Sequence, residues 1–279
     1  LREFRPDLVL GVGGYSSGPV VLSSHLAGIV TAIHEQNSLV GSANRLLFAF
    51  VDRIYLSYPL TLNAIGSRKA RLVGNPVRVG FSQPKSGSSG TFTVMVQGGS
   101  HGAPALNSLV LDSLPYLRDE KSLHFIHQTG RDDQTRVRLA YQSHAVSAEV
   151  EDFIPNPAAH LARANLVISR AGASAIAELT LSGSPALLVP LPFVDNHQVS
   201  NARPLARIGA AELLLQNSIC GATLANRILF YRAHPEKLAT MRERMLSLSY
   251  PHAAKSIVDD LYSLYHRLKS KESSVTISQ

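Results

Sequence analysis

The chain has 279 residues, of which 45% are hydrophobic and 17% charged, as in globular proteins with room for two ordinary domains. Its single cysteine, Cys220, excludes an intramolecular disulfide and fits a reducing cytoplasm, and no apolar run approaches the ~20 residues of a membrane helix. The net charge of +7 favours an anionic partner, such as a phosphate-bearing substrate or an anionic lipid surface, but the basic residues are scattered, which argues against nucleic acid.

The first part of the chain alternates short apolar runs with segments of helical periodicity. This alternation is typical of α/β folds with parallel sheets. Strands are expected at residues 7–10, 29–33, 53–56 and 71–73, and helices at 19–26 and 42–50.

Polar turns follow the first two of these strands. The turn at 11–14, together with Glu35, resembles a dinucleotide-binding fingerprint, in which glycines approach a diphosphate and an acid holds the ribose. However, Ser16 replaces the third glycine, and the second strand ends in the dense polar run H-E-Q-N at 34–37. A nicotinamide oxidoreductase is therefore the weakest function considered, and a solvated turn remains an alternative.

A domain boundary is expected between residues 74 and 90. Pro76 stiffens the run G-N-P-V-R at 74–78, and Arg78 is a candidate phosphate ligand, although a surface arginine beside a turn fits equally well. The Ser/Gly/Pro-rich residues 82–90 have the composition of an interdomain linker or of an exposed loop.

The alternation then restarts and continues almost to the end of the chain. Two doubly wound, Rossmann-like halves that face each other across a ligand are therefore the expected architecture. Strands are expected at 91–96, 123–127, 150–154, 164–168 and 185–190, and helices at 103–111, 136–144, 157–164, 173–181, 198–208, 222–231, 235–248 and 253–268.

The loop at 98–102 joins a strand to a helix and reads G-G-S-H-G. Its glycines let the backbone approach a ligand, and Ser100 offers a hydroxyl to a phosphate oxygen. Taken alone, this loop is weak evidence for a binding site, because many α/β proteins use such a loop only to turn the chain.

The run S-R-A-G-A-S-A-I-A-E at 169–178 is the most informative segment. It follows an apolar strand, turns at a glycine and opens a helix, which makes an anion site because free N–H groups point outward there. Glu178 can accept hydrogen bonds from two hydroxyls of a polyol. The run D-N-H-Q at 195–198 follows the next strand, so a diphosphate with a polyol is expected between the two strand ends.

The sequence contains no motif for a metal site, for a nucleophilic hydrolase or for a Walker-type nucleotide site. His34, His101, His127 and His197 lack the mutual spacing of metal ligands, and there is no nucleophile elbow or Walker loop. Neither a metal nor another cofactor is expected.

Taken together, these loops resemble the MurG family of bacterial N-acetylglucosaminyltransferases over about residues 5 to 265. The order and spacing of the set are specific, whereas each motif alone is not. The matching runs are G-V-G-G-Y-S-S-G-P (11–19), H-E-Q-N (34–37), G-N-P-V-R (74–78), G-G-S-H-G-A (98–103), F-I (153–154), R-A-G-A-S-A-I-A-E (170–178) and D-N-H-Q (195–198).

The resemblance implies a GT-B fold and a role for each matching residue. Glu178 would hold the ribose hydroxyls, and the main chain of Ile154 would read the uracil. Ser100 and residues 173–177, which include Ala173 and Ser174, would contact the diphosphate and nucleoside. Arg78 and Asn37 would contact the donor, and Gln198 would contact the sugar hydroxyls.

The resemblance also implies the reaction and its setting. N-acetylglucosamine would pass from UDP-N-acetylglucosamine to an undecaprenyl-linked muramoyl-pentapeptide (lipid I to lipid II), with inversion and without a metal, in peptidoglycan synthesis. The enzyme would be peripheral, on the cytoplasmic face of the bacterial inner membrane. The family's candidate catalytic histidine lies in a glycine-rich loop that precedes residue 1, so no catalytic residue is assigned, and His197 stands where the family commonly has glutamine.

The expected domains are an incomplete N-terminal acceptor and membrane-side domain (1–80), a C-terminal UDP-sugar domain (81–252), a helix returning to the first domain (253–268) and a disordered tail (269–279). Two further functions stay open. A UDP-sugar 2-epimerase shares the two-domain architecture, and a truncated remnant would bind donor without turnover.

Overall fold

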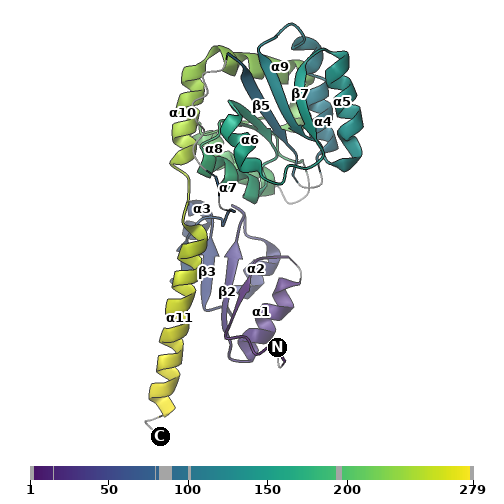
Figure 1. Cartoon of the computed structure of the whole chain (residues 1–279). Coiled ribbons are helices and arrows are strands. Elements are labelled where there is room, and N and C mark those ends of the chain that lie inside the picture. The colour runs from purple at the N-terminus through teal and green to yellow at the C-terminus, as the bar shows by residue number, and fades with distance from the viewer. Residues whose placement is uncertain are drawn as a thin grey trace. The chain divides into compact units, whose positions relative to one another are not determined.

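The structure, a computed structural model, describes residues 3–14, 16–78, 80–81, 90–99, 102–192 and 197–276, with side chains as far as residue 270. The chain forms two compact units (Figure 1): unit 1 comprises Leu1–Val77 and Tyr250–Gln279, and unit 2 comprises Arg78–Ser249. Among the described residues, no helix combines the length and apolar composition that crossing a bilayer requires.

Unit 1 is built on a parallel sheet in which the strands follow chain order, β1-β2-β3-β4. Its strands are β1 (Leu8–Gly11), β2 (Val30–Glu35), β3 (Arg53–Leu56) and β4 (Ala70–Leu72). Its helices are α1 (Ser17–Leu26), α2 (Ser42–Leu47), α3 (Pro59–Ile65) and α11 (Ala253–Thr276).

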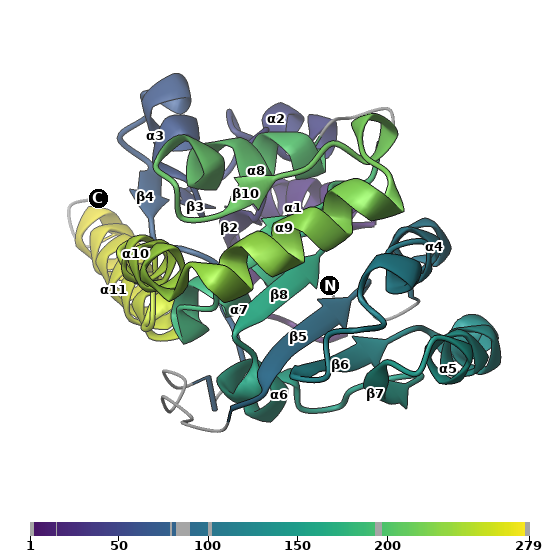
Figure 2. The ribbon, with the colours of Figure 1, turned by 90° about the horizontal axis from the view of Figure 1, so that it is seen from above.

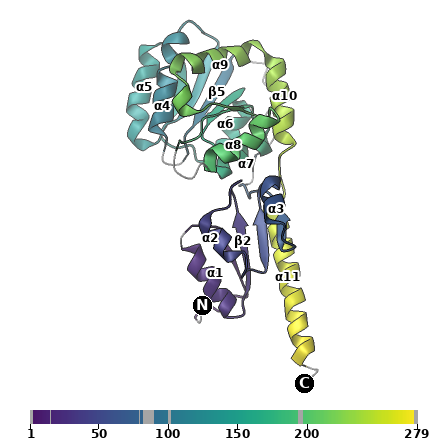
Figure 3. The same cartoon turned by 180° about the vertical axis from the view of Figure 1, so that it is seen from behind.

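Both faces of this sheet are covered, which explains why β2 and β3 are buried along their whole length. Successive strand residues point to opposite faces. Ile33 and Ile54 pack in one cluster with residues of α1 and α2, whereas Ala32 and Tyr55 pack in another with residues of α11. Figures 1 and 3 show α11 on the opposite side of the sheet from α1 and α2.

Helix α11 is fastened to the sheet by polar contacts as well. The hydroxyl of Tyr55 donates to Asp260 at 2.8 Å, and Arg53 forms an ion pair with the same carboxylate at 2.7 Å between Nε and Oδ2. The helix continues to Thr276, whereas its sequence predicts an end at Leu268.

Unit 2 is a larger parallel sheet in the order β10-β9-β8-β5-β6-β7. Figure 2 shows β8, β5 and β6 side by side in the middle of it. The strands are β5 (Phe92–Gln97), β6 (Leu123–Gln128), β7 (Ser147–Glu151), β8 (Leu166–Ser169), β9 (Ala186–Leu188) and β10 (Glu212–Leu213).

Helices cover this sheet on both sides, and alternate strand residues face them. Val94 and Val96 of β5 belong to a cluster with residues of α4, α5 and α9, and Met95 belongs to the cluster of α6, α7 and α8. The helices are α4 (Pro104–Leu111), α5 (Gln134–Ser143), α6 (Pro157–Arg163), α7 (Ala173–Ser182), α8 (His197–Arg207), α9 (Gly221–Ala233) and α10 (Pro235–Leu246), with short 3-10 turns η1 (Leu114–Tyr116), η2 (Arg131–Asp133) and η3 (Gln216–Ser218).

One predicted strand is misplaced. The sequence predicts a strand at 150–154, but β7 ends at Glu151 because the chain leaves the sheet there. The carbonyl of Asp152 accepts the N–H of Gly130 at 3.0 Å, and the Asp152 carboxylate accepts the N–H of Phe153 at 2.8 Å. Ile154 therefore lies in the loop after β7 rather than in the strand.

Candidate functional site

The strand order of unit 2 contains a reversal between β5 and β8. From β5 the chain proceeds outward through β6 to β7, and then returns to β8 on the other side of β5 and proceeds outward again. Gln97 and Ser169, which end these two strands, are partners in the register. In an open parallel sheet, the loops that follow such a pair of strands diverge and leave a crevice in which ligands bind. The candidate site is therefore the switch point between these two loops.

The loop after β5 lies close against its neighbours. A Cβ at Gly98 would lie 2.6 Å from the Cβ of Ala103, and a Cβ at Gly102 would lie 2.3 Å from the carbonyl oxygen of Thr129. Gly102 also has a φ of +76°, which favours glycine. Both positions thus need glycine for a steric reason, beyond the need for a turn.

Five residues of the predicted site loops lie outside the described residues: Tyr15 after β1, Ser100 and His101 after β5, and Asp195 and Asn196 before α8. Residues 82–89 of the predicted linker also lie outside them.

The loop after β8 leads directly into α7. Gly172 is the N-cap, with φ of −65° and ψ of 149°, and its carbonyl accepts the N–H of Ile176 at 3.0 Å. The N–H groups of Ala173 and Ser174 precede this first helical bond and have no acceptor within the helix. The positive end of the helix dipole thus points toward the switch point, which suits an anion.

Glu178 lies one turn after Ser174 on the same face of α7. Its side chain is partly buried and makes no hydrogen bond to the described residues. Burial raises the pKa of Glu178, and the nearby positive charge of Arg78 offsets part of this effect. The carboxylate is thus available as an acceptor next to the N-terminus of the helix.

Arg78 and Ile154 lie together in unit 2. Nη1 of Arg78 donates to the carbonyl of Pro155 at 3.3 Å, so the arginine rests on the loop that contains Ile154. The Ile154 side chain is 3% exposed and packs in the same core cluster as Met95. Its backbone N–H and C=O have no hydrogen-bond partner among the described residues. The backbone is free to bind a ligand while the side chain anchors the loop.

Gln198, in the first turn of α8, connects two loops at the carboxyl end of the sheet. Its Oε1 accepts the N–H of Ala171 at 3.2 Å, in the loop after β8, and the N–H of Leu191 at 3.0 Å, in the loop after β9. Asn201, which is fully buried, donates to the carbonyl of Ala171 at 3.3 Å. The turn before α7 is thus held by two side chains of α8.

A buried cation lies beside this turn. Arg170 is 6% exposed, and its Nη1 donates to the carbonyl of Val189 at 2.9 Å. Among the described residues it has no carboxylate partner. Burial lowers its pKa, but an arginine stays charged at any physiological pH. Its charge adds to the positive potential at the start of α7.

Asn37 lies in unit 1, at the carboxyl end of β2. Its N–H and its Nδ2 both donate to Oε1 of Glu35, at 3.0 and 3.3 Å. Oε2 of Glu35 accepts the N–H of Gly41 and Nδ2 of Asn44, each at 2.9 Å. Glu35 is 2% exposed, so it holds its own loop in place and does not present a carboxylate to a ribose. The interpretation of residues 11–14 and Glu35 as a dinucleotide-binding site therefore lacks the acidic residue that would hold the ribose.

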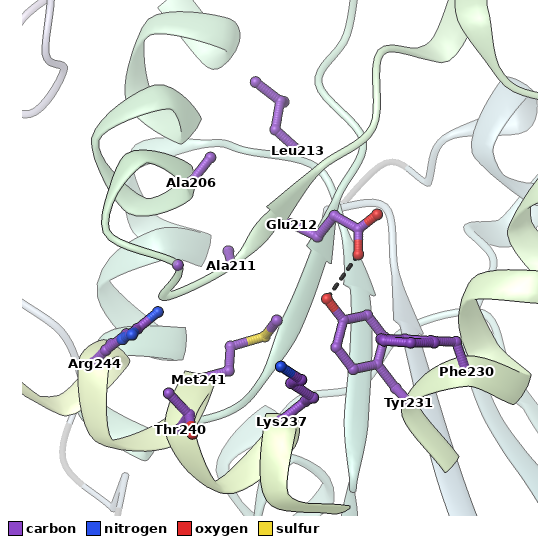
Figure 4. A pocket seen from close by; sticks show the side chains of 11 residues that line it. Ala206, Ala211, Glu212, Leu213, Phe230, Tyr231, Lys237, Thr240, Met241 and Arg244 are labelled. Carbon is purple, nitrogen blue, oxygen red and sulfur yellow. Dashed lines mark hydrogen bonds between the residues drawn. The ribbon is translucent and has the colours of Figure 1, made fainter. Parts of the chain in front are cut away.

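A separate hollow of about 500 Å³ lies between α8, β10, α9 and α10 (Figure 4). Glu212 accepts a hydrogen bond from Tyr231 at 2.7 Å there, and Lys237 and Arg244 line it from α10. None of the predicted site residues lines this hollow, so it is separate from the candidate site at the switch point.

The sequence reasoning missed the polar residues that end β6. Gln128, Thr129 and Gly130 support the loop after β5, and Gln128 donates to the carbonyl of Gly99 at 2.9 Å. The available signal was a run of polar residues at the carboxyl end of a strand, the same signal that drew attention to 34–37.

Comparison with known proteins decides the family. The model of the glycosyltransferase family 28 C-terminal domain matches residues 93–260, and that of the N-terminal domain matches residues 1–56. A curated UDP-N-acetylglucosamine–N-acetylmuramyl-(pentapeptide) pyrophosphoryl-undecaprenol N-acetylglucosamine transferase from Syntrophus aciditrophicus is 42% identical over 95% of this chain and 74% of its own length. The crystal structure of Acinetobacter baumannii MurG superposes with a TM-score of 0.78, at 29% identity over 94% of this chain and 76% of that one.

The chain belongs to the MurG family of glycosyltransferases. The predicted family, the α/β GT-B fold class and the hexosyltransferase activity are therefore confirmed. A UDP-N-acetylglucosamine 2-epimerase from Listeria monocytogenes also superposes, with a TM-score of 0.70 over 95% of this chain and 76% of that one. At 12% identity, this likeness shows the shared fold alone.

Proposed function

We propose that this MurG-family chain transfers N-acetylglucosamine from UDP-N-acetylglucosamine to a lipid-linked muramoyl-pentapeptide, and that the donor lies at the switch point of unit 2. One observation carries the assignment of the site. Glu178 follows the N-terminus of α7 by one turn, and α7 follows β8 at the switch point between β5 and β8. A helix N-terminus favours a diphosphate, and a carboxylate one turn further along can accept two hydroxyls of the attached ribose.

The other site residues have complementary roles in this proposal. The free backbone groups of Ile154 pair with the uracil, and Arg78, which rests on the same loop, contributes a positive charge to the donor. Ala173 and Ser174 offer N–H groups to the diphosphate. Ser100, which lies outside the described residues, stays a predicted hydroxyl contact to a phosphate oxygen. Gln198 keeps its Oε1 for the backbone and directs its amide N–H to the sugar hydroxyls. Asn37 stays a predicted contact to the donor.

The chemistry of the transfer requires stabilisation of a leaving anion. When the acceptor hydroxyl attacks the anomeric carbon, the glycosidic bond to the β-phosphate breaks and UDP departs with the bonding electrons. Preorganised N–H groups at α7 stabilise this charge, and a single lost donor of this kind costs about 3 kcal/mol where it has been measured. Arg170 and Arg78 add fixed positive charge nearby.

A membrane surface is the proposed partner of unit 1. Helices α1 and α2 expose large apolar side chains: Leu26 is 78% exposed, Leu46 is 76% exposed and Phe50, just after α2, is 42% exposed. His25 and Phe50 contact each other edge to face, with ring centroids 5.8 Å apart, which joins the two helices. Apolar side chains near the cation Arg45 suit peripheral attachment to an anionic leaflet, here the cytoplasmic face of the bacterial inner membrane.

The proposal is tested with donor labelled in the sugar and an undecaprenyl-linked muramoyl-pentapeptide in vesicles of anionic lipid. Transfer of label to the lipid, lost in Glu178→Ala, supports it. Conversion of the donor to its C2 epimer without acceptor would instead support the epimerase. Donor binding without any transfer would indicate a remnant that binds the donor but does not react.

A further inference from the structure

A buried polar network lies under the loop after β5. It consists of Asn107 on α4, His127 on β6 and Tyr141 on α5, which are 0%, 0% and 2% exposed. Nε2 of His127 lies 3.1 Å from Oδ1 of Asn107, and Nδ1 lies 3.1 Å from the hydroxyl of Tyr141. Three elements thus meet in one set of hydrogen bonds within an otherwise apolar core.

The partners of Asn107 determine the direction of every bond. Its Nδ2 donates to the carbonyl of Thr129 at 2.9 Å and to the carboxylate of Asp133 at 2.7 Å, and neither of these oxygens can donate. Oδ1 must therefore face His127 and accept from Nε2–H. Nδ1 is then unprotonated and accepts from Tyr141.

This arrangement does not change over the physiological pH range. Burial lowers the pKa of His127 to about 3, and burial raises the pKa of Tyr141 well above its usual value. Hydrogen bonds from Arg136 lower the pKa of Asp133, which stays ionised. The network therefore has one protonation state and one set of donors. A fully satisfied buried network of this kind rigidifies its surroundings.

The network reaches the loop after β5 from both sides. Asn107 lies in the first turn of α4, which this loop enters, and its N–H donates to the carbonyl of Ala103 at 2.9 Å. Thr129, which accepts from Asn107, presents the carbonyl oxygen that a Cβ at Gly102 would approach to 2.3 Å. The Asn107 side chain thus ties the first turn of α4 to the strand end on which the loop rests.

We infer that Asn107 and His127 are positioning residues that set the described ends of the loop after β5, Gly98–Gly99 and Gly102–Ala103, for the diphosphate of a nucleotide ligand. The inference rests on the proposed function, which places that diphosphate between this loop and α7. Gly98 and Gly102 have no side chains to fix their own backbone, so their positions depend on the neighbours they pack against, Ala103 and Thr129. A displacement of about 1 Å in a positioning element can cost on the order of 100-fold in function.

The test compares UDP with uridine, because only UDP carries the diphosphate. Calorimetric dissociation constants for both ligands are measured on the full chain for wild type, Asn107→Ala, His127→Gln and Tyr141→Phe. Ser184→Ala is the matched control, since Ser184 is fully buried and polar but lies in the turn before β9. Near-UV circular dichroism establishes which variants are folded.

The inference predicts that wild type binds UDP more tightly than uridine and that His127→Gln and Asn107→Ala reduce this preference by about 10- to 100-fold. Uridine affinity stays unchanged, as do both affinities in Ser184→Ala. A general loss of structure would instead weaken the binding of UDP and of uridine to the same extent. Tyr141→Phe removes one hydroxyl from the network and reduces the preference less.

The opposite results are distinguishable. A folded His127→Gln with an unchanged preference, or with equal losses for UDP and uridine, overturns the inference and leaves the proposed function intact. If Asn107→Ala and His127→Gln do not fold, an unchanged preference in Tyr141→Phe overturns it. A wild type that binds UDP no better than uridine overturns both the inference and the proposed donor site.

Discussion

The side-chain oxygen of Gln198 accepts a hydrogen bond from the backbone N–H of Ala171 at 3.2 Å, immediately before the turn into α7. The same oxygen accepts from Leu191, so Gln198 holds the loops after β8 and β9 with a single atom. Its amide nitrogen takes no part in either bond. The positioning of the loops and the proposed contact with the sugar thus belong to different atoms of one side chain.

These two roles are separated by Gln198→Glu. A glutamate keeps an oxygen that accepts from both N–H groups, but it has no N–H to donate to a sugar. We expect an unchanged melting temperature and a fall of up to about tenfold in the ratio of UDP-N-acetylglucosamine affinity to UDP affinity. Taking the ratio cancels the effect of the added charge on the diphosphate. Gln198→Leu loses the acceptor as well and should also melt earlier. An unchanged ratio in Gln198→Glu would limit Gln198 to holding the loops.

Glu178 is expected to lower the stability of the protein when it is ionised. Because burial raises its pKa in the folded state, with Arg78 offsetting part of the shift, the folded state binds this proton more tightly than the unfolded state does. Stability is then lost as pH rises through the folded pKa. Glu178→Gln should melt higher than wild type in neutral buffer and equally in strongly acidic buffer, as calorimetric melts at both pH values would show.

The same shift predicts the pH dependence of donor binding. The ionised carboxylate of Glu178 is the proposed acceptor for the ribose hydroxyls, so UDP affinity should fall as the pH drops through its raised pKa. Titrations of UDP across this range measure the effect, and Glu178→Gln provides the control, since its residual affinity should lack this component. A wild-type profile that is parallel to that of Glu178→Gln would exclude Glu178 as the group responsible.

The close contact at Gly102 is tested by a pair of alanine substitutions. Gly99 and Gly102 both have positive φ, +91° and +76°, but a Cβ at Gly99 meets no atom within 4 Å, whereas one at Gly102 would lie 2.3 Å from Thr129. Both variants carry backbone strain of about 1–3 kcal/mol. Only Gly102→Ala must also displace the loop, so urea unfolding should show the larger loss for it, together with weaker UDP binding. Equal losses in the two variants would argue against the contact.

The ion pair that fastens α11 is also open to test. Arg53 and Asp260 have side chains that are 6% and 27% exposed, so Asp260→Asn leaves a buried guanidinium without its counter-charge. We expect a loss of about 1–3 kcal/mol in urea unfolding. Asp259→Asn removes the neighbouring exposed carboxylate, which pairs with Lys255, and should cost less than about 1 kcal/mol. If Asp259→Asn is as damaging as Asp260→Asn, the buried pair is not what holds the helix.

Local patterns in the sequence predict most of the elements, because they arise from local chemistry. The strand at 53–56 is predicted and observed with the same limits, since an apolar run lies between turns. Helix α3 is missed because it has little apolar periodicity, although Pro59 at its first turn and Gly66 in the left-handed conformation at its end mark it. Strand β10 is only two residues long and exists through its pairing with β9, which no local pattern shows.

The candidate site likewise has features that the sequence predicts and contacts that it does not. The anion-binding turn before α7 and Glu178 are visible in the sequence, because a strand, a glycine and a helix start occur in order. The bond from the N–H of Ala171 to Gln198 and the bond from Asn107 to Thr129 join residues 27 and 22 positions apart. Such contacts depend on the order of the strands, which the sequence does not show directly.

Donor binding at the switch point of unit 2 is tested most directly by calorimetric titration with UDP-N-acetylglucosamine, beside UDP-glucose, on wild type and Glu178→Ala. We predict that wild type prefers UDP-N-acetylglucosamine and that Glu178→Ala weakens its binding by about 10- to 100-fold while keeping the wild-type fold. Unchanged affinity in a folded Glu178→Ala, or no binding by folded wild type, would contradict the placement of the donor beside α7.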